Sequence, residues 1–141
     1  MNVRRLRPGD EAVVEQLAPP PDMPHTALLA DDRTVFVVAF DDDERVMGFA
    51  FGYELPRRHG TAKTLFVYEV DVAPACRRQG VATRLLNELS RIAVARGIEE
   101  GFVLTAASNA AGMRLYESVG GVRPYADDVM WDFTFPLRST Q

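Results

Sequence analysis

The chain has 141 residues, of which 47% are hydrophobic and 26% are charged, values that are typical of one soluble globular domain. Sixteen Lys and Arg residues against twenty Asp and Glu residues leave a formal net charge of −4, which disfavours nucleic-acid binding. One cysteine and two histidines argue against an internal disulfide and against a metal centre. The longest apolar stretch, 46–53, is too short to cross a membrane, and the basic start of the chain lacks the apolar region of a signal peptide. We therefore expect a single cytoplasmic domain, residues 1–141, with no metal, membrane or nucleic-acid partner.

Apolar periodicity and turn residues divide the chain into strands and helices. Strands are expected at 2–6, 35–40, 46–53, 65–72, 102–106 and 129–135. Helical segments are expected after Asp10, around 27–30, from Val81 to a closing Gly97, and from Asn109 to Gly120. The order is thus β-α-α-β-β-β-α-β-α-β, an α/β domain with a mixed, twisted central sheet flanked by helices and a parallel crossover through the long helix.

The helix that begins at residue 81 has the clearest pattern in the chain. Its apolar residues recur at helical spacing and form one stripe, made of Val81, Leu85, Leu86, Leu89, Ile92 and Ala93. Arg84, Glu88 and Arg91 lie opposite, at spacings that allow ion pairs along the solvent face. The pattern predicts a helix that covers one face of the sheet.

The segment 77–83, with the sequence RRQGVAT, lies at the start of this helix and directly after a predicted strand. The free N–H groups and the positive end of the dipole at a helix start bind anions without any side chain. Gly80 lets a phosphate approach the backbone closely, and Arg77 and Arg78 add positive charge. The segment by itself predicts a phosphate-sized site and leaves the reaction open.

Two sets of residues in this order resemble a known superfamily. Arg77-x-x-Gly80-x-Ala82, after a strand ending in Val-x-Val-x-Pro, resembles the acetyl-CoA signature of the GNAT superfamily of N-acetyltransferases. Asn109, the LYE sequence at 115–117 and Gly120 resemble the second half of the pattern. The element order also matches, so the resemblance covers the whole chain and implies the GNAT fold.

A narrower resemblance is to the class I aminoglycoside 3-N-acetyltransferases. It is carried by the sequences PPPD at 19–22, LLA at 28–30, YELPR at 53–57, YEVDV at 68–72, RRQGVAT at 77–83 and DDVMWDF at 127–133. The chain departs from these patterns at Gly121, where many superfamily members carry an aromatic residue, and at His25, where a tyrosine is expected.

The superfamily resemblance implies acetyl-CoA as co-substrate, with its pyrophosphate on the backbone amides of 78–83. Its pantetheine arm is expected to pair with the strand 65–72 like an added β-strand. The implied cofactor-binding residues are Val70, Asp71, Val72, Arg77, Arg78, Gln79, Gly80, Val81, Ala82, Thr83 and Asn109.

The same resemblance points to Tyr116 as the general acid that protonates the departing thiolate. A thiol has a pKa of about 8.5 and tyrosine of about 10, so this donation is uphill by roughly 2 kcal/mol, which a positioned hydrogen bond tolerates. The attacking amine must lose a proton, and Glu69, which shares a strand face with Asp71, is the first candidate base. In the alternative interpretation Tyr116 packs in the core and Glu69 only satisfies neighbouring backbone.

For the class I enzymes the acceptor is a polycationic aminocyclitol, which requires an anionic cleft. The expected acceptor contacts are Asp22, Glu54, Asp127 and Asp128. The resemblance thus implies acetylation of an aminoglycoside, at its 3-amino group, as an antibiotic-resistance activity. The alternatives are acetylation of another polyamine or of a protein amino terminus, and a non-catalytic acyl-CoA-binding sensor. A homodimer is also expected, because relatives often pair through their sheets.

Overall fold

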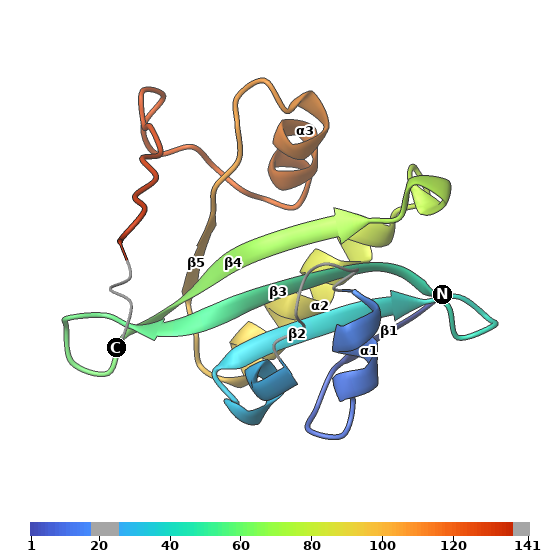
Figure 1. The fold of residues 1–141 in the computed structure, drawn as a ribbon. Coiled ribbons are helices and arrows are strands. Elements are labelled where there is room, and N and C mark those ends of the chain that lie inside the picture. The colour runs from blue at the N-terminus through green and yellow to red at the C-terminus, as the bar shows by residue number, and fades with distance from the viewer. Residues whose placement is uncertain (18–25, 137–141) are drawn as a thin grey trace.

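The computed structural model describes residues 1–17 and 26–136 and contains a five-stranded sheet with the order β1-β2-β3-β4-β5 (Figure 1). The strands are β1 (Asn2–Arg5), β2 (Thr34–Phe40), β3 (Val46–Pro56), β4 (Lys63–Val72) and β5 (Glu100–Val103). The helices are α1 (Glu11–Gln16), α2 (Val81–Ala95) and α3 (Ala110–Ser118), with short 3-10 helices η1 (Thr26–Ala30) and η2 (Pro74–Cys76). Strands β1 to β4 pair antiparallel, and β5 joins β4 in parallel after α2. The predicted mixed sheet and parallel crossover are confirmed.

One face of the sheet is covered by α2, which lies behind the sheet in Figure 1. The predicted stripe is confirmed, since the buried side chains of α2 are Val81, Leu85, Leu89 and Ile92. They form one core cluster with alternate residues of β2, among them Val35, Val37 and Ala39. Gly97 follows the helix with φ +73°, a left-handed conformation that suits glycine at this position.

The opposite face of the sheet carries a second, aromatic cluster. The intervening residues of β2, including Phe36 and Phe40, pack there with Phe51 of β3, Val14 of α1 and Leu29 of η1. Phe36 and Phe51 stack with ring centroids 4.9 Å apart. The sheet is therefore buried on both faces along β2 and β3.

Strands β4 and β5 pair only over part of their length. The register runs from Thr64↔Glu100 to Val67↔Val103. Beyond Val67, residues 68–72 of β4 have no neighbouring strand on this side within the described chain. This part of β4 therefore leaves backbone N–H and C=O groups free to pair with an extended ligand.

Two sequence predictions about the end of the sheet need correction. The strand expected to be buried at 102–106 is instead Glu100–Val103, and Phe102 is 45% exposed. The last strand predicted at 129–135 is wrong for the single chain, because the described part of the structure has no strand after α3. Alternating apolar residues form a strand only when their backbone finds a partner, and within residues 1–17 and 26–136 no backbone–backbone hydrogen bond involves 129–135.

Candidate active site

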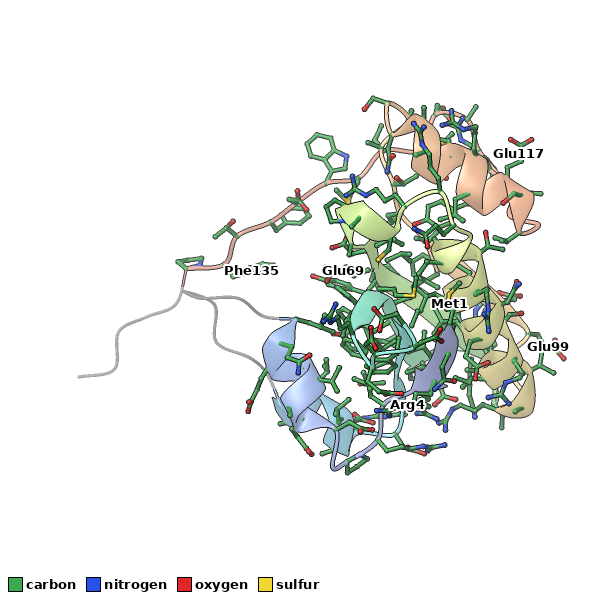
Figure 2. The ribbon with its side chains drawn as sticks, turned by 90° about the vertical axis from the view of Figure 1, so that its right-hand side faces the viewer. Met1, Arg4, Glu69, Glu99, Glu117 and Phe135 are labelled. Carbon is green, nitrogen blue, oxygen red and sulfur yellow. The ribbon has the colours of Figure 1, made fainter. Side chains whose placement is uncertain are left out.

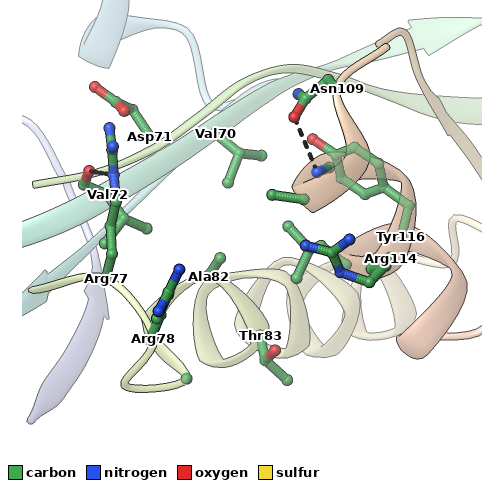
Figure 3. Close-up of a pocket in the computed structure, with 14 residues that line it drawn as sticks. Val70, Asp71, Val72, Arg77, Arg78, Ala82, Thr83, Asn109, Arg114 and Tyr116 are labelled. Atoms are coloured by element: carbon green, nitrogen blue, oxygen red, sulfur yellow. Dashed lines mark hydrogen bonds between the residues drawn. The ribbon is translucent and has the colours of Figure 1, made fainter. Parts of the chain in front are cut away.

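A cleft of ≈ 580 Å³ lies where the end of β4, the start of α2 and α3 meet (Figure 3). Strand β4 contributes Val70, Asp71 and Val72 to its lining. The turn before α2 and its first residues contribute Arg77, Arg78, Gly80, Ala82 and Thr83. The segment of α3 contributes Asn109, Ala111, Gly112, Arg114, Leu115 and Tyr116.

The start of α2 faces this cleft without a side-chain cap. Its N-cap residue, Gly80, has φ +77° and no side chain, so the N-cap itself makes no side-chain hydrogen bond to the first amides of the helix. Arg78 also has a positive φ of 62°, a backbone conformation that is uncommon for a residue with a side chain. Free amides and the positive end of the helix dipole are thus directed at the cleft, as the sequence predicted for an anion site.

Three arginines add positive charge on two sides of the cleft. Figure 3 shows Arg77 and Arg78 on one side and Arg114, from α3, on the other. Arg77 Nε donates to the Val72 carbonyl oxygen over 3.4 Å, which ties the turn to the end of β4. Among the described residues that line the cleft, Asp71 is the one acidic residue. The donor set therefore fits the phosphate groups of coenzyme A.

Asn109 acts as the N-cap that the sequence predicts for α3. Its Oδ1 accepts from the Gly112 N–H over 3.1 Å, and its Nδ2 donates to Thr105 Oγ1 over 3.2 Å. A Cβ on Gly112 would lie 2.6 Å from Asn109 Nδ2, so a side chain at this position would displace the capping amide. The cap holds the start of α3 against the cleft.

Tyr116 projects from α3 into the lining of the cleft, as a general acid requires (Figure 3). Burial raises the pKa of Tyr116 above its usual value of 10, so the phenol stays protonated at neutral pH. Its carbonyl oxygen accepts from the Gly121 N–H over 2.8 Å. A Cβ on Gly121 would also lie 2.8 Å from that oxygen, which explains why the chain carries glycine here rather than an aromatic residue.

Glu69 does not line the cleft, although Asp71, two residues further along β4, does. Val70 and Val72 pack toward α2, so the alternating Glu69 and Asp71 face away from it. Burial, and then the negative charge of Asp71, raises the pKa of Glu69. Glu69, in the part of β4 beyond its pairing with β5, is therefore a carboxylate that takes up a proton more readily than a fully solvated one.

Two tyrosines that sequence reasoning missed lie beside Glu69. The register between β3 and β4 passes from Gly52↔Val67 to Phe51↔Glu69, which leaves Tyr68 as an extra residue in a β-bulge. Tyr68 then contacts Tyr53, with ring centroids 5.7 Å apart. Burial raises the pKa of Tyr53 most, and electrostatic interactions with Tyr68 and Glu69 raise it further. These three side chains therefore lie close to one another. The sequence contains no local signal for the bulge.

Glu54, an expected acceptor contact, is held in an ion-pair cluster elsewhere. Its carboxylate accepts from Arg96 Nη2 over 2.7 Å and lies 3.1 Å from Lys63 Nζ. Burial alone would raise the pKa of Glu54, but the hydrogen bonds from Arg96 and Lys63 outweigh it and lower the pKa below its usual range. The side chain is 5% exposed and borders a separate hollow of ≈ 190 Å³ near Arg33, not the main cleft. The geometry gives Glu54 a structural role in place of the expected contact.

The other expected contacts are scattered. Asp127 and Asp128 are exposed in the segment after α3 and do not line the cleft, and Asp22 lies outside the described residues.

Among the expected cofactor residues, Val81 points into the core and Gln79 donates to the Ala75 carbonyl oxygen over 3.3 Å, so neither side chain lines the cleft. Arg114 was not predicted. It lies two residues before Tyr116 on α3, and residues at that spacing do not share a helix face, so the local sequence contains no signal for it.

No helix within 1–17 or 26–136 combines the length and the apolar character that a bilayer span requires.

A parallel β4–α2–β5 crossover, a cationic cleft at the start of α2 and a tyrosine opposite define the chain as a GNAT-fold acetyltransferase domain. The sequence model of the Acetyltransferase (GNAT) family matches residues 3–121, and the chain belongs to this family. Acetyltransferases of the family take the acetyl group from acetyl-CoA.

Three proteins that are similar to this chain are described here, two by structure and one by sequence. An aminoglycoside acetyltransferase from an uncultured soil metagenomic sample is 26% identical, with a TM-score of 0.80 over 97% of this chain and 98% of that one. AAC(6')-Iy, in complex with the bisubstrate analogue CoA-S-monomethyl-acetylneamine, is 18% identical with a TM-score of 0.75 over 94% and 97% of the two chains, a likeness of fold. L-2,4-diaminobutyric acid acetyltransferase of Methylotuvimicrobium alcaliphilum is 33% identical over 82 residues, 58% of this chain and 46% of that protein. This last match thus spans about half the length of the curated relative.

Proposed function

We propose that this protein transfers the acetyl group of acetyl-CoA to an amino group of an aminoglycoside, its 3-amino group, and so confers antibiotic resistance. The observation that carries the transfer chemistry is the cleft itself, in which an uncapped helix start and three arginines face a half-buried tyrosine. The aminoglycoside acceptor is supported by the likeness to the soil enzyme over nearly the whole chain. Glu69 and Asp71, on the face of β4 away from α2, supply negative charge for a polycationic acceptor.

Acetyl-CoA supplies an activated acetyl group as a thioester. The amides at the start of α2, with Arg77, Arg78 and Arg114, hold its phosphates. The free edge of β4 at 68–72 presents backbone groups along which an extended pantetheine arm pairs as an added strand. One of these strand amides is suited to stabilise negative charge on the thioester carbonyl oxygen.

Two side chains transfer protons during the reaction, one as general base and one as general acid. Glu69 removes a proton from the acceptor ammonium, directly or through a water, so that the nitrogen lone pair attacks the thioester carbon. The new C–N bond forms as the C–S bond breaks, and the Tyr116 hydroxyl donates its proton to the sulfur. The pKa of Glu69 is shifted toward neutral pH, and a general base is most effective when its pKa lies near the pH of the reaction.

The first experiment measures thiol release from acetyl-CoA, with product mass, for gentamicin, kanamycin, spermidine, 2,4-diaminobutyric acid and a short peptide. We expect rapid single acetylation of the aminoglycosides, with the position assigned by NMR. Turnover of spermidine or peptide alone would refute the acceptor class and keep the transfer chemistry. Binding of acetyl-CoA without any turnover would favour the sensor alternative.

A small diamino acid is a second candidate acceptor, favoured by the 33% identity to the diaminobutyric acid enzyme over 82 residues. It shares with aminoglycosides two amino groups but adds a carboxylate. Preference for 2,4-diaminobutyric acid over kanamycin in the same assay would replace the aminoglycoside proposal.

The role of Tyr116 is tested with Tyr116→Phe. Loss of a positioned general acid lowers kcat by about 10²–10⁴-fold. Acetyl-CoA affinity, measured by calorimetry, stays near that of the wild type, because the arginines and the start of α2 are unchanged. Tyr125→Phe is the matched control, since Tyr125 is 67% exposed and outside the cleft lining. Equal turnover of the two variants would remove Tyr116 from the mechanism.

A further inference from the structure

A row of aromatic side chains crosses three strands of the sheet. The register places Tyr53 of β3 opposite Phe66 of β4, and Phe66 beside Phe102 of β5. The rings of Phe66 and Phe102 stack with centroids 4.6 Å apart. Tyr68 contacts both Tyr53 and Phe66, with its ring centroid 5.7 Å from each of theirs. These four residues, Tyr53, Phe66, Tyr68 and Phe102, are here called the aromatic wall.

The aromatic wall lies on the face of the sheet away from α2. Leu65 and Val67, on either side of Phe66, pack with the core cluster under α2, so Phe66 faces the other way. Tyr53 packs with the aromatic cluster on that opposite face. Figure 2 shows Glu69 on the same side of the sheet, away from α2. The wall and this carboxylate therefore share one face.

The bulge in β4 brings a ring of the wall directly beside the carboxylates. In a regular strand, consecutive residues such as Tyr68 and Glu69 point to opposite faces. The extra residue at the bulge removes that alternation, and Tyr68 contacts Phe51 with ring centroids 5.4 Å apart. Glu69 and then Asp71 continue the same face along β4. The surface thus passes from aromatic rings to two negative charges.

The exposure of the wall points to a ligand rather than to sheet stability alone. Cross-strand aromatic pairs stabilise a sheet through contact with each other, and this role needs no ring surface in solvent. Tyr68 is nevertheless 58% exposed and Phe102 45% exposed. The face of an aromatic ring is negative and attracts a cation within about 6 Å of its centre. Beside Glu69 and Asp71, such rings complement a cation that also has flat apolar faces.

We infer that the aromatic wall determines acceptor specificity by stacking against the rings of a polycationic amino sugar while Glu69 receives the proton of the reacting amine. This inference rests on the proposed function and refines it. The C–H faces and the ammonium groups of an amino sugar are both attracted to aromatic ring faces. The carboxylate of a diamino acid is instead repelled by Glu69 and Asp71. The wall therefore favours an extended polycation over a small amino acid.

Tyr68 is the position for the test, because its exposed ring can be replaced without opening the core. Tyr68→Leu keeps an apolar side chain but removes the aromatic face, and should raise the KM for kanamycin by about 5–30-fold. The kcat should change by less than about 2-fold, because the lost contact is present in the ground state and the transition state alike. Tyr68→Phe should keep the KM within about 2-fold of wild type. Tyr68→Trp should keep or lower it, since indole is the strongest cation–π partner.

Binding is also measured without turnover, by NMR titration of kanamycin into the protein with coenzyme A in place of acetyl-CoA. Protons that lie over an aromatic ring face shift upfield. We expect this shift with wild type and Tyr68→Phe, and its loss with Tyr68→Leu. Tyr125→Leu is the matched control, since Tyr125 is 67% exposed and should leave both KM and shifts unchanged. Circular dichroism verifies that each variant is folded.

The outcomes separate this inference from the proposed function. If wild type acetylates kanamycin and folded Tyr68→Leu has the wild-type KM, the wall is not part of the acceptor site and the proposed function stands. A fall in kcat at unchanged KM would also overturn the inference, because it would place Tyr68 outside acceptor binding. If wild type neither binds nor acetylates kanamycin, the inference and the proposed acceptor are both wrong.

Discussion

The ion-pair cluster around Glu54 leads to a prediction that separates a structural role from acceptor binding. Glu54 is 5% exposed and Arg96 23% exposed, with Oε2 and Nη2 2.7 Å apart. Breaking a buried pair by removal of one partner costs about 3–5 kcal/mol. Lys63 lies 3.1 Å from the same carboxylate and still pairs with it in an Arg96→Met variant, so we expect a smaller loss than this, about 2–3 kcal/mol. At roughly 4 °C per kcal/mol for a domain of this size, Tm should fall by about 8–12 °C.

The assay is urea unfolding of wild type and Arg96→Met between pH 7 and pH 4. Because the folded-state pKa of Glu54 lies below its usual value of 4.5, the stability from its pairing is present above pH 4.5 and is lost as the pH falls further. Arg96→Met raises that pKa, so the stability gap should narrow as the pH falls toward and below 4.5. Arg91→Met is the matched control, since Arg91 pairs with Glu88 on the same helix with 67% of its side chain exposed, and it should show no measurable change.

Two results would refute this reasoning. If Arg96→Met lowers the free energy of unfolding no more than the control does, the Glu54–Arg96 pair stabilises the fold no more than a surface ion pair. A Glu54→Gln variant that keeps its stability but shows a raised KM for the acceptor would restore Glu54 as an acceptor contact.

Three further outcomes follow from the core and from the site. Leu85→Ala, at a fully buried position of α2, should lower the free energy of unfolding by about 2–5 kcal/mol in urea titrations. Asp71→Asn removes a negative charge that raises the pKa of Glu69, so the acid limb of the pH profile of kcat/KM should move to lower pH; an unmoved limb would argue against Glu69 as the base. Gly121→Ala places a Cβ 2.8 Å from the Tyr116 carbonyl oxygen and should cost about 1–3 kcal/mol in thermal unfolding, and an unchanged Tm would contradict the close approach.

The features that the sequence determined by itself depend on short stretches of chain. The α2 stripe follows from helical periodicity, and the Asn109 cap from a bond to an amide three residues away. The uncapped start of α2 beside the cleft follows from Gly80 directly before the apolar stripe. These features need no distant partner, so a local pattern is sufficient to predict them.

Tertiary structure decided what depends on distant segments meeting. The sequence predicts Glu54 as a carboxylate of the acceptor cleft, but in the fold it pairs with Arg96, 42 residues further along the chain. The placing of Tyr68 beside Tyr53 and Glu69 comes from a bulge in the β3–β4 register, which two strands set together. The alternation of 129–135 predicts a strand, but strand formation needs the backbone of a neighbour, which the described part of the chain does not supply. Periodicity identifies the face of a segment that will be buried, and only the fold identifies the surface that buries it.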